Sequence, residues 1–196
     1  MAGSPRIIPR WATHELLAQL ETHRVVSVVG CRQSGKTTIL LKTPLPHVKF
    51  QSLDVQANFS AAVADPSYFV RRRSPDILVI DEIQKVPQLI GEIKFQVDRN
   101  PEKGQYIIAG SSDYRKLPQA NESLAGRAGL VRVRTFSEAE QRSMQPGFLQ
   151  ALFDGLLPLS LRFDCSKEMV LETVIRGGYP EIPVSYTHLT LPTILR

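Results

Sequence analysis

Cysteine and long apolar runs are both scarce in this sequence. The chain has 2 cysteines among 196 residues, which excludes a disulfide framework and a zinc site with four cysteine ligands. Isolated thiols are typical of a reducing compartment. No apolar run approaches the roughly 18 residues that a membrane-spanning helix needs, and residues 1–10 lack the apolar core of a signal peptide. We therefore expect a cytoplasmic protein without a membrane partner.

A strong excess of charge is lacking as well. The chain carries 24 Lys and Arg against 19 Asp and Glu, a formal net charge of +5, which is too small to indicate nucleic-acid binding by itself. With 42% hydrophobic and 22% charged residues, the composition is that of a globular protein and excludes global disorder. The length fits one domain, or one domain with the beginning of another.

The last residues are expected to be foreign to the natural protein. Residues Val184–Thr193 read VSYTHLTLPT, which resembles the conceptual translation of a transposon mosaic-end adaptor used to build sequencing libraries. We therefore leave residues 184–196 out of the fold prediction as an adaptor artefact. The natural protein is then expected to continue beyond Pro183, and an uninterrupted genomic reading frame through VSYTHLTLPT would contradict this interpretation.

Short β-branched or apolar runs alternate with segments of helical periodicity from residue 11 to residue 134. Such alternation predicts an α/β three-layer fold, with helices on both faces of a mostly parallel, five-stranded sheet. We expect strands at residues 25–29, 48–53, 77–80, 106–109 and 130–134. The helices are expected at 11–22, with Thr13 as the N-cap, and at 34–41, 58–73 and 89–97.

After residue 135 the pattern becomes helical, at residues 137–143, 150–153 and 167–176. The predicted organisation is therefore a helical lead-in at 1–24, a core at 25–135, a helical segment at 136–183 that begins a truncated C-terminal region, and the adaptor residues 184–196.

One predicted strand is followed directly by GCRQSGKT, which matches G-x-x-x-x-G-K-[S/T] between a strand and a helix. Glycines at the two fixed positions let backbone amides point inward and form an anion-binding nest at a helix N-terminus. Lys36 is expected to reach the β- and γ-phosphates of a nucleotide, and the Thr37 hydroxyl to ligate Mg²⁺. The residues of this loop expected to bind phosphate are Gly30, Ser34, Gly35, Lys36, Thr37 and Thr38.

The strand predicted at 77–80 delivers two acids, Asp81 and Glu82, at its C-terminal end. In an open α/β sheet this end faces the ligand crevice. Asp81 is expected to hold Mg²⁺ through water, and Glu82 to polarise the attacking water. Because phosphoryl transfer to water needs positioning and charge neutralisation more than covalent help, one metal carboxylate and one base favour hydrolysis.

Two further candidate catalytic residues have more than one interpretation. Ser111 follows the strand predicted at 106–109, and its hydroxyl would lie beside the γ-phosphate if that strand runs between those at 25–29 and 77–80. The alternative for Ser111 is an ordinary helix N-cap. Arg127 is a candidate for a phosphate contact in its own chain or from a neighbouring subunit, and the alternative is a surface or strand-flanking arginine.

Taken together, these segments resemble the bacterial and archaeal AAA-type ATPases that carry a C-terminal domain of unknown function. The resemblance runs from Ile8-Pro9-Arg10 through GCRQSGKTT, LVIDEIQKVPQL, AGSS and SLAGR to GGYPE at residues 177–181. It implies a P-loop fold of the additional-strand type, in which Lys36 and Thr37 contact phosphate and magnesium and Ser111 lies near the sensor position. It also implies that Asp81 and Glu82 are the Walker B pair, and that Arg32, Gln33 and Gln84 line the site.

The sequence departs from that family in two respects. Cys31 stands where the family usually has proline, which removes no phosphate contact. The family's C-terminal domain is missing after GGYPE, so DNA or a protein partner that binds through that half is left open, as is the oligomeric state.

The function expected from these residues is ATP binding and Mg²⁺-dependent ATP hydrolysis that drives a conformational switch. The main alternative is a nucleotide-gated module that binds DNA or a protein with little turnover, and a small-molecule kinase is a third possibility. Because the chain has no N-K-x-D motif for reading guanine, ATP is favoured over GTP.

Overall fold

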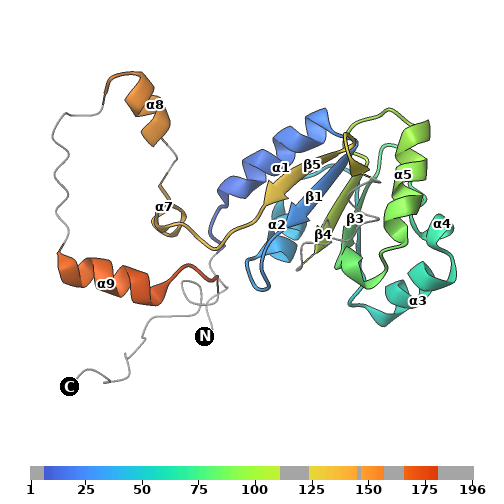
Figure 1. The fold of residues 1–196 in the computed structure, drawn as a ribbon, viewed down its shortest axis with the longest axis horizontal. Helices are drawn as coiled ribbons and strands as arrows, with labels where there is room; N and C mark the ends of the chain where they lie inside the picture. The colour runs from blue at the N-terminus through green and yellow to red at the C-terminus, as the bar shows by residue number, and fades with distance from the viewer. Residues whose placement is uncertain (1–6, 111–123, 145–146, 157–165, 181–196) are drawn as a thin grey trace. The chain divides into compact units, whose positions relative to one another are not determined.

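The structure is a computed structural model that describes residues 7–110, 124–144, 147–156 and 166–180. The chain divides into two compact units. One is Arg10–Arg134, which contains the whole sheet, and the other joins Met1–Pro9 with Thr135–Arg196 (Figure 1). The finer boundaries expected from the sequence stay predictions.

Five parallel strands form the sheet of the first unit, in the order β2-β3-β4-β1-β5. Their bounds are β1 Val25–Val29, β2 Val48–Ser52, β3 Ile77–Asp81, β4 Tyr106–Gly110 and β5 Ala128–Arg132. The α/β prediction is therefore confirmed, and β5 starts and ends two residues before the predicted range. Strand β4 lies between β1 and β3, the order that local sequence patterns leave undetermined.

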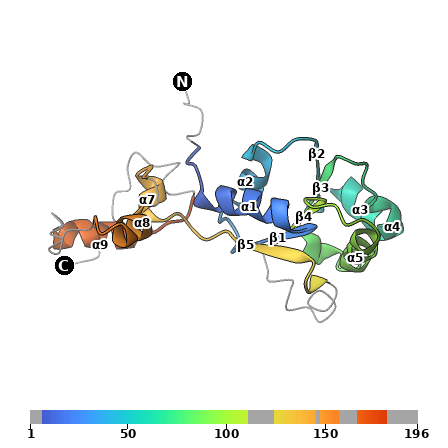
Figure 2. The same ribbon diagram turned by 90° about the horizontal axis from the view of Figure 1, so that it is seen from above.

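Helices cover both faces of this sheet, as Figures 1 and 2 show. On one face α1 (Trp11–Thr22) and α2 (Lys36–Lys42) pack against β1, with Leu16 and Ile39 in the same apolar cluster as Val28. The opposite face carries α3 (Gln56–Ala64), α4 (Pro66–Phe69) and α5 (Leu89–Arg99). Every residue of β1, β3 and β4 is buried, which explains why these strands read as nearly continuous apolar runs, interrupted by Ser27 in β1 and ended by Asp81 in β3.

Two details of the predicted helices are wrong. The segment expected to be one helix at 58–73 forms two helices, α3 and α4, and the second of them ends at Phe69. Asp65 separates them, because it caps α4 by accepting a hydrogen bond from the Tyr68 N–H. Proline has no backbone N–H to donate, and the first position of a helix requires none, so the proline at the first position of α4 favours this new start. The N-cap of α1 is Arg10 and not Thr13.

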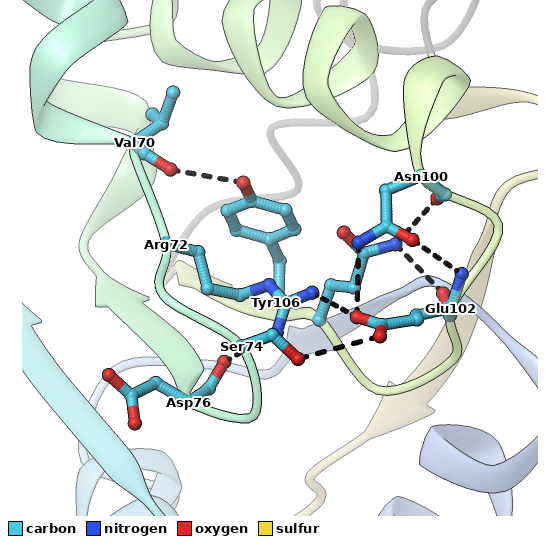
Figure 3. A network of polar contacts seen from close by, with 8 residues as sticks. Val70, Arg72, Ser74, Asp76, Asn100, Glu102 and Tyr106 are labelled. Atoms are coloured by element: carbon cyan, nitrogen blue, oxygen red, sulfur yellow. Dashed lines mark hydrogen bonds and ion pairs between the residues drawn. The ribbon is translucent and has the colours of Figure 1, made fainter.

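A polar network closes the sheet at the N-terminal ends of β3 and β4 (Figure 3). Arg72 donates to the Asp76 carbonyl oxygen at 3.0 Å and pairs with the Glu102 carboxylate at 2.6 Å. The buried Tyr106 hydroxyl donates to the Val70 carbonyl oxygen at 3.0 Å, and burial raises the pKa of Tyr106 to about 12. These contacts hold the connections before β3 and β4 together.

The second unit contains the short helices α7 (Glu138–Gln141) and α8 (Phe148–Phe153), and α9 (Lys167–Arg176), which has the predicted bounds. Ser137 and Glu140 form a capping box at the start of α7, and Arg176 of α9 donates to the Glu138 carboxylate at 3.1 Å. Within the described parts of the chain, no helix is long and apolar enough to span a membrane.

Candidate functional site

The loop between β1 and α2 depends on glycine at two positions for different reasons. Gly35 has a φ of 92°, in the left-handed region that disfavours other residues. At Gly30 a Cβ atom would lie 2.2 Å from the Val133 carbonyl oxygen and 2.8 Å from Ser34 Oγ. Only glycine therefore fits at Gly30 without displacing the backbone that follows β5.

Lys36 and Ser34 are the two buried polar side chains of this loop. The Lys36 Nζ donates to the carbonyl oxygens of Gly30 and Cys31, at 3.0 and 2.9 Å, so the ammonium group folds back across the loop. Ser34 is fully buried, and its Oγ makes no hydrogen bond to any residue that the structure describes. Buried hydroxyl groups almost always have a partner, so this atom is suited to a ligand held in the loop.

Strand β3 brings a carboxylate to the same place. The Thr37 hydroxyl, in the first turn of α2, donates to Asp81 Oδ2 at 2.8 Å, and the Glu82 N–H donates to Asp81 Oδ1 at 3.0 Å. Asp81 is only 3% exposed. Burial raises the pKa of its carboxyl above the ordinary value, and the negative Glu82 acts in the same direction, against the Thr37 hydrogen bond and Lys36.

Glu82 has an unusual backbone for its residue type. Its φ and ψ are 58° and 41°, in the left-handed region, where it begins the short 3₁₀ helix η1 (Ile83–Lys85). The Gln84 side-chain amide donates to the Glu82 carboxylate. Non-glycine residues in this conformation cluster at functional sites, and Glu82 lies directly after Asp81 at the C-terminal edge of the sheet.

The remaining predicted phosphate-binding residues lie around the same loop. Arg32, Gln33 and Thr38 have exposed side chains, and Gln33 has a φ of 62°. Ser111 lies outside the described residues. It directly follows Gly110, which pairs with Val29 at the end of β1, so the strand order on which its predicted role depends is present.

The structure does not bring Arg127 to this loop within one chain. Arg127 directly precedes β5, whose first residue is in register with the first residue of β1, whereas the loop follows the last residue of β1. Five residues of strand, at about 3.3 Å each, separate the two edges by roughly 16 Å. Arg127 instead pairs with Asp98 of α5 at 2.5 Å, which agrees with the alternative of a surface or strand-flanking arginine.

Arg10 is a residue near the loop to which sequence reasoning gave no role. It is only 9% exposed, its Nη1 donates to the Ser34 carbonyl oxygen at 2.8 Å, and its Nη2 donates to the Arg134 carbonyl oxygen at 2.6 Å. An arginine at the start of an amphipathic helix normally faces solvent, so no local pattern indicates these contacts.

Comparison with known proteins decides the family. Residues 22–141 match the model of a family described as the AAA domain, which is more than half of the 196-residue chain. The chain belongs to this AAA domain family. Membership of the AAA domain family indicates nucleotide binding and hydrolysis as the class of activity. The predicted family resemblance is confirmed for the ATPase part, and the C-terminal domain of unknown function stays a prediction.

The chain is also similar to individual proteins and to a solved structure. The AAA domain chain is 34% identical over 125 residues to the uncharacterized proteins Mb2031c of Mycobacterium bovis and Rv2008c of Mycobacterium tuberculosis. These matches cover 62% of this chain but 27% of each mycobacterial protein. The Walker-type ATPase PABY2304 of Pyrococcus abyssi has a similar fold, with a TM-score of 0.54 and 16% identity, over 91% of this chain and 66% of that one.

Proposed function

We propose that this AAA domain binds ATP and hydrolyses it with the help of Mg²⁺. The observation that carries the proposal is the 2.8 Å hydrogen bond from Thr37 Oγ1 to Asp81 Oδ2, which joins residues 44 positions apart. It places the end of the glycine loop and the acidic end of β3 at one site, as a shared nucleotide requires.

The donor atoms at this place fit a magnesium ion and a phosphate chain. Thr37 and Asp81 offer a hydroxyl and a carboxylate, the hard oxygen ligands that Mg²⁺ prefers, and few protein ligands are usual because Mg²⁺ keeps waters and phosphate oxygens. The buried Ser34 Oγ and the Lys36 ammonium group face the same loop. Bound Mg²⁺ would neutralise negative charge on the phosphates.

Each residue then has a defined role. Lys36 exchanges its two loop carbonyl partners for β- and γ-phosphate oxygens. Thr37 and Asp81 hold Mg²⁺, and Glu82 orients the attacking water and takes its proton, with its carboxylate held by Gln84. The other residues that we propose to contact phosphate are Gly30, Arg32, Gln33, Ser34, Gly35 and Thr38.

Further parts of the proposal rest on the sequence. Ser111 contacts the γ-phosphate. Arg127 contacts phosphate only from a neighbouring subunit, since in its own chain it lies at the opposite end of the strands from the loop. Hydrolysis resets a conformational switch in a cytoplasmic protein, and the partner that responds to the switch, DNA or a protein, is bound through the C-terminal domain that the family resemblance implies.

A lysine pair in α2 tests nucleotide binding. Lys36→Ala removes the ammonium group from the loop, whereas Lys42→Ala removes an exposed lysine from the last turn of the same helix. Binding of fluorescent ATP and of GTP is measured by anisotropy, with and without Mg²⁺. We expect Lys36→Ala to abolish ATP binding and Lys42→Ala to retain it. Equal affinity of both variants would refute the assignment of the loop.

A glutamate substitution tests hydrolysis separately from binding. Glu82→Gln keeps the shape of the side chain but removes the base, so ATP should stay bound while phosphate release falls by about 10²–10⁴-fold. Phosphate release at saturating ATP measures this, and turnover at the native rate would remove Glu82 from its role. Binding of ATP by the native protein without any phosphate release would favour the nucleotide-gated module instead.

A further inference from the structure

The Arg10 guanidinium joins the loop between β1 and α2, which we call the phosphate loop after its proposed function, to the backbone that follows β5. It donates from Nη1 to the Ser34 carbonyl oxygen at 2.8 Å and from Nη2 to the Arg134 carbonyl oxygen at 2.6 Å. We propose that Arg10 is a positioning residue, which holds the loop in the conformation that receives the phosphates of ATP. This inference rests on the proposed function of the loop.

The loop needs external support at Ser34. Its neighbours Gln33 and Gly35 both have left-handed backbones, with φ of 62° and 92°. This conformation is costly for glutamine and persists only when the surroundings impose it. Because a trans peptide is planar, a fixed Ser34 carbonyl also fixes the Gly35 N–H, which points the opposite way in the same peptide unit. Arg10 thereby orients one amide of the anion-binding nest.

The other end of the Arg10 contact is a firm anchor. Arg134 follows Val133, whose N–H donates to the Val29 carbonyl oxygen at 2.8 Å and thus continues the pairing of β5 with β1. The backbone of Arg10 is held too, because it is the N-cap of α1 and its carbonyl oxygen accepts from the Thr13 N–H at 3.1 Å. Helix α1 packs on β1 and β5, so the guanidinium extends from a fixed base.

The chemistry of arginine suits this task. A guanidinium presents several N–H donors in one rigid plane, so two carbonyl oxygens can be held at a fixed separation. Hydrogen bonds from a charged donor are also stronger than neutral ones. A lysine at this position would offer one rotating ammonium group, which cannot reproduce both contacts in the same geometry. Arg10→Lys is therefore a substitution that keeps the charge and removes the fork.

Arg24 is a matched control. Its Nη1 also donates to a backbone carbonyl oxygen, that of Val97, at 2.9 Å, but Arg24 precedes β1 at the opposite edge of the sheet from the loop. Arg10→Gln and Arg24→Gln each remove a guanidinium–carbonyl contact from the same compact unit. A loss of general stability should therefore follow either change, whereas a change in the loop should follow only the change at Arg10.

Two measurements on the 196-residue chain test the proposal. Hydrogen–deuterium exchange of the peptide that covers residues 31–36, without nucleotide, reports the loop directly. Binding of fluorescent ATP with Mg²⁺ reports the function, and thermal unfolding controls for stability. We expect Arg10→Gln to accelerate loop exchange and to weaken ATP binding about tenfold, Arg10→Lys to have a smaller effect in the same direction, and Arg24→Gln to leave both readouts at native values.

The outcomes separate this inference from the proposed function. If the native chain does not bind ATP, the proposed function fails, and loop exchange alone decides the positioning role of Arg10. Native loop exchange and native ATP affinity in Arg10→Gln would overturn the inference, as would equal losses in Arg10→Gln and Arg24→Gln. Should Arg10→Gln fail to fold, Arg10→Lys decides, and native exchange and affinity in that variant would overturn the inference.

Discussion

Replacement of Gly30 by alanine tests how closely the phosphate loop and the end of β5 approach one another. The new Cβ would lie 2.2 Å from the Val133 carbonyl oxygen, whereas ordinary contacts begin near 3.4 Å, so the backbone must move by about 1.2 Å. Val133 resists this movement, because its N–H donates to the Val29 carbonyl oxygen at 2.8 Å. The methyl group also meets Ser34 Oγ at 2.8 Å.

The expected cost combines two effects. Overpacking of a close contact costs about 1–3 kcal/mol, and loss of a backbone hydrogen bond adds about 0.5–1.5 kcal/mol. We therefore expect the free energy of unfolding to fall by about 1.5–4.5 kcal/mol and Tm to fall by roughly 3–18 °C, since 1 kcal/mol corresponds to about 2–4 °C at this chain length. ATP affinity is expected to fall at least tenfold, because the loop moves.

Gly91→Ala is the control for this experiment. Gly91 is an exposed residue of α5, and a Cβ there meets nothing within 4 Å, so alanine should stabilise the helix by roughly 0.5–1 kcal/mol. Urea unfolding and fluorescent ATP binding are measured for both variants. Two results together would refute a close contact at Gly30. The free energy of unfolding of Gly30→Ala would lie within about 0.5 kcal/mol of the native value, which is about the error of such comparisons, and the variant would bind ATP as tightly as the native protein.

Two further predictions concern residues away from the loop. Tyr106→Phe removes the hydroxyl that donates to the Val70 carbonyl oxygen, which should cost about 1 kcal/mol at neutral pH. The pKa of Tyr106 in the folded protein is raised to about 12, so the native protein loses stability between pH 10 and pH 12, by about 2–3 kcal/mol in total. Unfolding in urea at pH 7 and pH 11 should show that the variant lacks this loss of stability at alkaline pH. Arg127→Gln should leave ATP affinity unchanged and lower phosphate release only at protein concentrations where chains associate, because Arg127 pairs with Asp98 at the edge opposite the loop. A fall in phosphate release that is the same at every protein concentration would contradict this prediction.

Local patterns predicted the elements well where one physical signal dominated. The run Val25–Val29 has β-branched valines at every position except Ser27 and can be buried on both faces, and the structure has a strand with these bounds. The helix predicted at 58–73 failed because its apolar period continues through Asp65, although that side chain favours a cap over a helix interior. Strand β5 begins at Ala128 because pairing with β1 extends across small residues, Ala128 and Gly129, that carry no strand propensity of their own.

The candidate site divides in the same way. The loop Gly30–Thr37 can be recognised from sequence because its motif occupies eight consecutive residues between a strand and a helix. The Val133 carbonyl oxygen that excludes a Cβ atom at Gly30 is a distant contact, which no local pattern indicates. The sequence does not establish the contact between Thr37 and Asp81, because the contact depends on β3 being parallel to β1 and separated from it by β4 alone. Arg10 could not be assigned, because its partners are backbone oxygens whose positions depend on the turn of the loop and the end of β5.

Local sequence patterns predict the class of fold and the kind of ligand group, because strand burial, helical period and the geometry of a glycine loop are properties of short segments. Which segments meet depends on the tertiary structure. Strand order places β4 between β1 and β3 and brings Thr37 to Asp81. The parallel register of β5 with β1 leaves Arg127 at the opposite end of the strands from the loop. The physical reason is that pairing of parallel strands is set by long crossover connections and by the burial of both sheet faces, which no local pattern encodes.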